Sequence, residues 1–168
     1  MKTCCVVTVD GSRARIMMIE DVWPEQAGPE LKEVETLLNA ENLVPDRALW
    51  SDKNNSNRGA ADLPHGYDDH RQRHRQASLQ HFANRIVNRL LVLAAAQRTD
   101  LILILAESKM LGFIRKAWAK RSACGLVIKD DPKHLSRLSP HELHHYLARE
   151  GLLPARHAPA GWRGRAAP

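Results

Sequence analysis

The chain has 168 residues, of which 43% are hydrophobic, and it carries a formal charge of +6 at pH 7. This length and composition suit one packed domain with a short tail and argue against a second domain of ordinary size. No apolar run has the length of a membrane span or a signal sequence, so we expect a soluble, cytoplasmic protein with no membrane partner.

The charge is strongly polarised along the chain. Residues 1–69 carry 7 Lys and Arg against 13 Asp and Glu, whereas residues 70–168 carry 18 against 6. Residues 70–99 contain six arginines and three histidines without one acidic residue. Such a segment predicts an anionic partner, most commonly a nucleic acid. The alternative is a solvated arginine-rich helix that binds nothing in particular.

The N-terminal third predicts three antiparallel strands. Residues 3–9 are apolar and β-branched, Asp10 and Gly11 supply a turn, and residues 13–20 resume as a second strand, which together indicate a hairpin. Residues 31–38 alternate well enough for a third strand, although a short helix competes. Residues 39–72, rich in Asn, Asp, Gly, Ser and Pro, predict a long exposed loop.

The rest of the chain predicts alternating helices and strands. A helix begins at about Arg73, with apolar residues recurring every three or four positions from Leu79 to Leu93. The later predicted elements are a buried central strand at 101–106, a helix at 109–120, a strand at 125–129, a helix at 140–149 and a disordered basic tail at 153–168.

This order predicts a single α/β domain over residues 1–152. Three antiparallel strands followed by α-β-α-β-α imply a mixed sheet with helices on both faces, and a ribonuclease H-like layout fits best. The three cysteines, Cys4, Cys5 and Cys124, have neither disulfide nor metal spacing and are expected to be buried thiols.

Two catalytic patterns are present but weak. His141, Glu142 and His145 satisfy the HExxH spacing of zinc hydrolases, yet no third ligand follows, and both histidines should face solvent. Asp10 and Glu107 end predicted strands, as in metal-dependent nucleases, but the first long helix offers no acid to join them. We therefore expect no cofactor and lean towards a non-enzyme, with a metal-dependent hydrolase or nuclease as the alternative.

Several segments resemble the bacterial host attachment protein family, described as proteins required for attachment to host cells. The most specific segment is DGSRARI, which contains Asp10, Gly11, Ser12, Arg13 and Arg15. The other matching segments are Asp46-Arg47, Ser51-Asp52, Leu111-Gly112 with Arg115-Lys116, and LSRLSPHEL at residues 135–143. The resemblance covers about residues 1–150.

That family is thought to be related to the central domain of archaeal and eukaryotic peptide-release factors. The relation implies a ribonuclease H-like fold and, by analogy, a connection with the ribosome. Release factors carry Gly-Gly-Gln before their first long helix, whereas this chain has His74, Arg75 and Gln76. Gln76 matches the glutamine, but the missing glycines remove the backbone freedom that peptide release requires.

The sequence therefore predicts a non-catalytic interaction protein that binds RNA or the ribosome through a basic helical face. Its protein partners and oligomeric state are not indicated. The predicted nucleic-acid-binding residues are Arg71, Arg73, Arg75, Gln76, Arg85, Arg89, Lys109, Arg115, Lys116 and Lys120.

Overall fold

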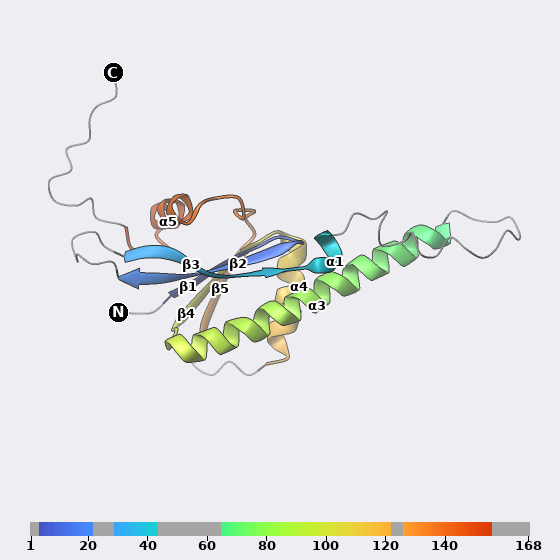
Figure 1. The fold of residues 1–168 in the computed structure, drawn as a ribbon, viewed down its shortest axis with the longest axis horizontal. Coiled ribbons are helices and arrows are strands. Elements are labelled where there is room, and N and C mark those ends of the chain that lie inside the picture. Colours follow the sequence, from blue (N-terminus) through green and yellow to red (C-terminus); the bar gives the residue numbers. More distant parts are fainter. Residues whose placement is uncertain (1–3, 22–28, 44–64, 122–125, 156–168) are drawn as a thin grey trace, which may run out of the picture.

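The computed structural model describes residues 4–21, 29–43, 65–121 and 126–155. They form five strands and four helices around one central sheet (Figure 1). The strands are β1 (Cys4–Val9), β2 (Arg13–Asp21), β3 (Pro29–Leu38), β4 (Leu101–Ala106) and β5 (Val127–Asp131). The helices are α1 (Ala40–Leu43), α3 (His65–Gln97), α4 (Ser108–Ala119) and α5 (Pro140–Arg149).

The sheet is mixed, with the strand order β3-β2-β1-β4-β5. The first three strands pair antiparallel, whereas β4 lies parallel to β1 and β5 lies parallel to β4. The prediction of a mixed α/β sheet is confirmed. The last strand lies slightly later than predicted, at Val127–Asp131, because its register with β4 starts at Val127 opposite Leu101.

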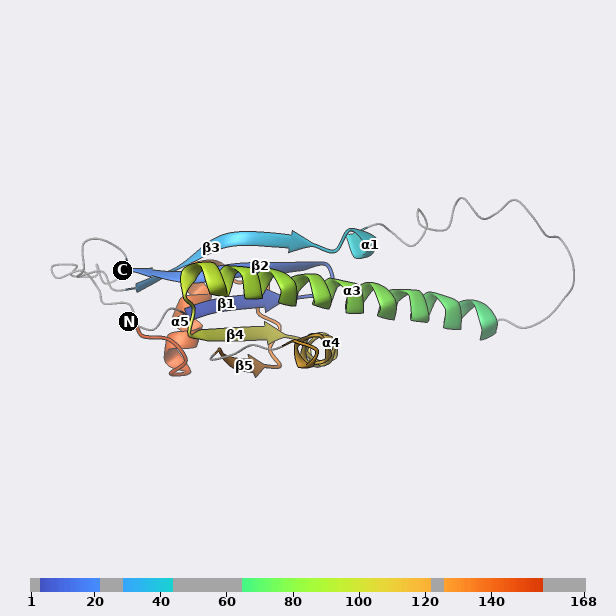
Figure 2. The ribbon, with the colours of Figure 1, turned by 90° about the horizontal axis from the view of Figure 1, so that it is seen from below.

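Alternate side chains of the central strands fill two separate cores. Cys5 and Val7 of β1 point towards α3 and α4, while Cys4 and Val6 point towards α5. β4 divides in the same way, which is why its sequence is apolar throughout. The expected burial of Cys4 and Cys5 is confirmed, whereas Cys124 lies outside the described residues. Figure 2 shows α3 lying across one face of the sheet.

The N-terminal part of α3 extends beyond the sheet (Figures 1 and 2). Among its described side chains, Ser78 is the first that is buried, and residues 72–77 are all exposed. We call residues 65–77 the α3 arm. From Leu79 to Ala94 the helix packs on the sheet, with Phe82, Ile86 and Leu90 at most 1% exposed.

The predicted start of this helix was too late, and the predicted loop was too long. α3 begins at His65 rather than near Arg73, and α1 occupies Ala40–Leu43, so residues 44–64 alone lie between them, outside the described part. The arm carries no apolar stripe, which is why periodicity missed it. Residues 65–97 contain no proline, so the helical hydrogen-bond ladder can continue upstream of the packed segment.

None of the described helices is long and apolar enough to cross a membrane.

Candidate functional site

The DGSRARI segment forms the tight connection between β1 and β2. Asp10 Oδ1 accepts hydrogen bonds from the backbone N–H of Ser12 (2.8 Å), the Ser12 hydroxyl (2.7 Å) and the backbone N–H of Arg13 (2.8 Å). This is an aspartate turn, in which the carboxylate accepts hydrogen bonds from backbone N–H groups of the turn. Burial alone would raise the pKa of Asp10, but hydrogen bonds from Ser12, Arg13 and Ser136 outweigh it and hold the pKa below its usual value.

Two arginines after this turn hold the loop that leads into α5. Arg13 Nη2 donates to the carbonyl oxygen of Ser136 (3.2 Å), and Arg15 Nη1 donates to the carbonyls of Ser136 (3.1 Å) and Leu138 (2.6 Å). Arg15 Nε and Nη2 both donate to Glu33 Oε2 on β3 (2.8 and 2.7 Å). The two most distinctive segments of the sequence, DGSRARI and LSRLSPHEL, therefore meet at one end of the sheet.

The same loop is also tied to the end of β4. His134 Nδ1 lies 2.8 Å from Glu107 Oε1, and His134 Nε2 lies 3.2 Å from the Ser136 hydroxyl. The order acid, imidazole, hydroxyl is that of a catalytic triad. Ser136 is only 2% exposed, however, so its hydroxyl has no route to a substrate carbonyl. We interpret the cluster as a polar joint between the two segments and name it the motif junction: Asp10, Arg13, Arg15, Glu107, His134 and Ser136.

A second polar contact connects this end of the sheet to α3. The Asn39 side-chain amide donates to the Gly11 carbonyl (3.1 Å) and to the Ser78 hydroxyl (3.2 Å), and both Asn39 and Ser78 are 4% exposed. The Ser78 hydroxyl can be buried because Asn39 supplies the hydrogen-bond partner that it requires.

The predicted nuclease carboxylates do not form a metal centre in the described part of the chain. Asp10 and Glu107 end the adjacent parallel strands β1 and β4, as predicted, but Asp10 is occupied by its turn and Glu107 by His134. Within the described ranges, no group of three or more His, Cys, Asp or Glu side chains is placed to hold a metal ion.

The predicted anion-binding residues fall into three groups. Arg73, Arg75 and Gln76 are exposed on the α3 arm, and Arg71, on the same arm, is half-buried. Lys109 and Lys116 are exposed on α4, and Lys120 is exposed just after its end. The other three are engaged within the protein. Arg89 pairs with Glu35 (2.7 Å), Arg115 pairs with Asp130, and Arg85 donates to the Leu38 carbonyl (3.2 Å).

The histidines of α5 lie as the sequence predicted, but the HExxH glutamate is not placed for catalysis. His141 and His145 are exposed. Glu142 Oε2 accepts hydrogen bonds from the backbone N–H (2.9 Å) and hydroxyl (2.7 Å) of Ser139, which completes a capping box at the helix start. These bonds from Ser139 hold the pKa of Glu142 below its usual value. Glu142 is therefore an ionised cap rather than a general base.

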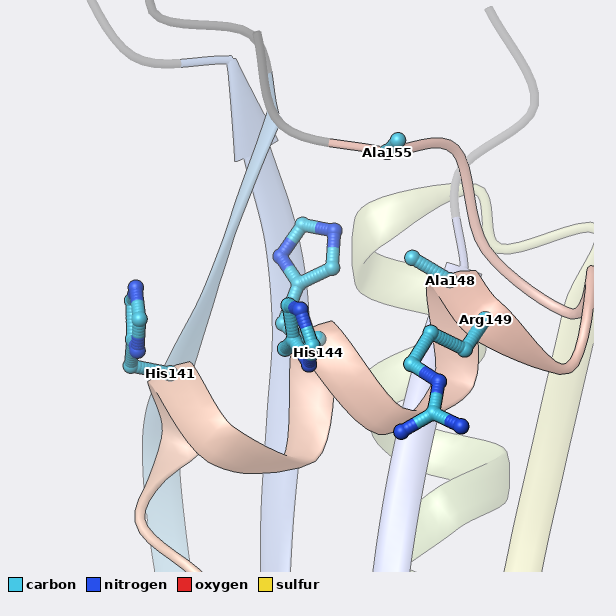
Figure 3. Close-up of a pocket in the computed structure, with 6 residues that line it drawn as sticks. His141, His144, Ala148, Arg149 and Ala155 are labelled. Atoms are coloured by element: carbon cyan, nitrogen blue, oxygen red, sulfur yellow. The ribbon is translucent and has the colours of Figure 1, made fainter. Parts of the chain in front are cut away.

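A cavity of about 320 Å³ lies between α5 and the chain that follows it. Its walls are His141, His144, His145, Ala148, Arg149 and Ala155. Figure 3 shows Ala155 on the segment that passes across from the helix. His144 is 1% exposed, and its Nε2 lies 2.8 Å from the Pro154 carbonyl oxygen, which fixes that segment against the helix.

Sequence reasoning missed His134, Ser136, Asn39 and His144. The segment LSRLSPHEL had been singled out, but its role as the acceptor of two arginines has no local signal, since the partners lie more than 120 residues away. Of the other family segments, Asp46-Arg47 and Ser51-Asp52 lie outside the described residues.

Comparison with known proteins bears on this arrangement. A search of curated proteins returned no match. One similar solved structure, described as an archaeal protein, has 10% sequence identity and a TM-score of 0.35. The alignment covers 89% of this chain, which spans 38% of the length of that structure. The family described as "Protein required for attachment to host cells" matches residues 5–147, which include every residue of the motif junction. Because this match extends over most of the sequence, the chain belongs to that family.

Proposed function

We propose that this protein is a non-catalytic interaction protein that binds RNA, free or within the ribosome, through the α3 arm. The observation that carries the proposal is the arm itself, a basic helical segment that extends beyond the sheet and whose described side chains from 72 to 77 are all exposed. At about 1.5 Å per residue the arm is roughly 20 Å long.

Between residues 71 and 77 the arm carries three arginines and no acid, whereas Asp68 and Asp69 lie one turn upstream. Successive helical residues are rotated by about 100°, so Arg71 and Arg75 lie on one side, whereas Arg73 lies nearly opposite. A helix that docks on a flat surface needs charge on one side only. Arginines on two opposite sides suit a rod that enters a groove with phosphates on both walls, such as the groove of a folded RNA.

Two acids of β3 are held by arginines outside the arm. Glu33 pairs with Arg15, and Glu35 pairs with Arg89, each at 2.7 Å. These pairs lie on the sheet and not on the arm. We therefore restrict the proposed RNA-binding surface to the arm and the lysines of α4. Helix α4 packs beside α3 on the same face of the sheet.

The strand order and directions support a ribonuclease H-like architecture, in which β2 alone runs against its neighbours. Such a fold would be consistent with a relation to the central domain of peptide-release factors and with a cytoplasmic, ribosome-linked role. In that case the attachment named in the family description would follow from altered expression of other proteins rather than from adhesion by this chain.

The test measures binding of a fluorescein-labelled RNA hairpin by anisotropy over a series of salt concentrations. The triple variant Arg71→Gln, Arg73→Gln and Arg75→Gln should bind more weakly, and the slope of log K against log salt should shrink by about 2–3 as phosphate contacts are lost. The matched control removes three exposed charges elsewhere, at Lys32, Lys129 and Arg137, and should bind like the unaltered protein.

Charge reversal at Arg89 is a poor test, because it would break the pair with Glu35 and disturb the fold. Circular dichroism should show that the arm variant keeps its helical content. Equal RNA affinity of the arm variant and the unaltered protein, or binding that does not respond to salt, would refute the proposal.

A further inference from the structure

We propose that the cavity between α5 and residues 152–155 binds a small molecule through its phosphate group. The cavity lies on the face of the sheet opposite to α3, so this inference is independent of RNA binding by the arm.

The helix brings three nitrogen-rich side chains into one line. His141, His145 and Arg149 follow one another at intervals of four residues, which places them on the same side of α5. All three are exposed, and within the described ranges none of them forms a hydrogen bond or ion pair. Their N–H groups are therefore available to a ligand.

The opposite wall is already in place. Gly151 adopts a φ of +67°, which reverses the chain after the helix. Leu152 and Leu153 then donate backbone hydrogen bonds to the Leu147 carbonyl (2.9 and 3.3 Å). With the His144–Pro154 contact, these bonds hold the returning segment against the helix, so a ligand would find a formed cavity.

Among the described residues, no carboxylate lines the cavity. The two acids nearest in sequence are engaged elsewhere, since Glu142 caps the helix through Ser139 and Glu150 lies 3.6 Å from Lys133 Nζ. The walls thus combine three imidazoles and one guanidinium with the small apolar side chains of Ala148 and Ala155. A lining of N–H donors without acids selects an oxyanion.

A phosphate monoester fits this lining best. A guanidinium can donate two parallel hydrogen bonds to a phosphate, and imidazoles add further donors and, when protonated, positive charge. The cavity volume of about 320 Å³ is at the lower end of the range for small-molecule pockets, which suits a compact ligand such as a sugar phosphate.

The experiment uses the full chain labelled with ¹⁵N and ¹³C and titrates inorganic phosphate at constant ionic strength. We expect saturable chemical-shift changes at the rings of His141 and His145 and at Arg149 Nε. Arg149→Gln should weaken binding by about tenfold, because it removes the bidentate donor.

The matched control is Arg137→Gln, which removes an exposed arginine outside the cavity and should leave phosphate affinity unchanged. Shift changes that never saturate, or that are the same in Arg149→Gln and Arg137→Gln, would overturn the proposal. Equal competition by an RNA hairpin for the same resonances would also overturn it, because the site would then recognise a phosphodiester backbone.

Discussion

Replacing Arg15 by methionine should destabilise the fold by about 3–4 kcal/mol. The guanidinium is 11% exposed and donates to the carbonyls of Ser136 and Leu138, and hydrogen bonds from a charged group are worth about 1.5–3 kcal/mol each. At the lower value the two carbonyl bonds contribute about 3 kcal/mol. The pair with Glu33 adds at most about 1 kcal/mol, because that carboxylate is 33% exposed and screened by solvent.

Urea unfolding followed by circular dichroism measures this loss as a fall in the free energy of unfolding at unchanged m-value. Arg137→Met, which makes the same change at an exposed site outside the motif junction, should alter stability by less than about 0.5 kcal/mol. Arg15→Lys should recover part of the loss, since one ammonium group cannot reach both Glu33 and the loop carbonyls. A loss below about 1 kcal/mol for Arg15→Met would refute the reasoning that the two segments are joined through this side chain.

Three further predictions follow from buried polar groups. The pKa of Asp10 is lower in the folded protein than in the unfolded chain. Ionised Asp10 therefore contributes its full stability above about pH 4, and this contribution is lost as the pH falls through the folded-state pKa. Asp10→Asn should flatten the acid limb of a plot of unfolding free energy against pH. Burial raises the pKa of Cys4 to about 11 and that of Cys5 to about 12. In a Cys124→Ser variant, a thiol reagent at about pH 8 should therefore react with these two thiols only after unfolding. Rapid labelling of the native protein would contradict this prediction. Ser78→Ala should cost about 1–3 kcal/mol in urea unfolding because it removes the partner of a buried amide, whereas a neutral effect would mean that Asn39 finds another partner.

The sheet was predictable from sequence because its signals are local. Apolar runs, a turn at Asp10-Gly11 and helices of regular period between strands were enough to place most elements. The start of α3 was not predictable in this way, because residues 65–77 have no apolar period to read.

The motif junction could be suspected from sequence only as two unusual segments. Nothing in the pattern shows that Arg13 and Arg15 reach backbone carbonyls of a loop more than 120 residues away, because every residue has such a carbonyl. His144 was missed for a related reason. Its ring is buried beside Leu143 because the Pro154 carbonyl satisfies one nitrogen, and that carbonyl belongs to a segment after the helix.

The use of backbone acceptors at the motif junction has an evolutionary consequence. For Arg13 and Arg15, the side chains at positions 136 and 138 are interchangeable, whereas the spacing of the two carbonyl oxygens is not. Point substitutions in this loop should therefore be tolerated by the arginines, but the insertion or deletion of a single residue would carry the oxygens out of their reach. Loop length, more than loop composition, is the property that selection must preserve here.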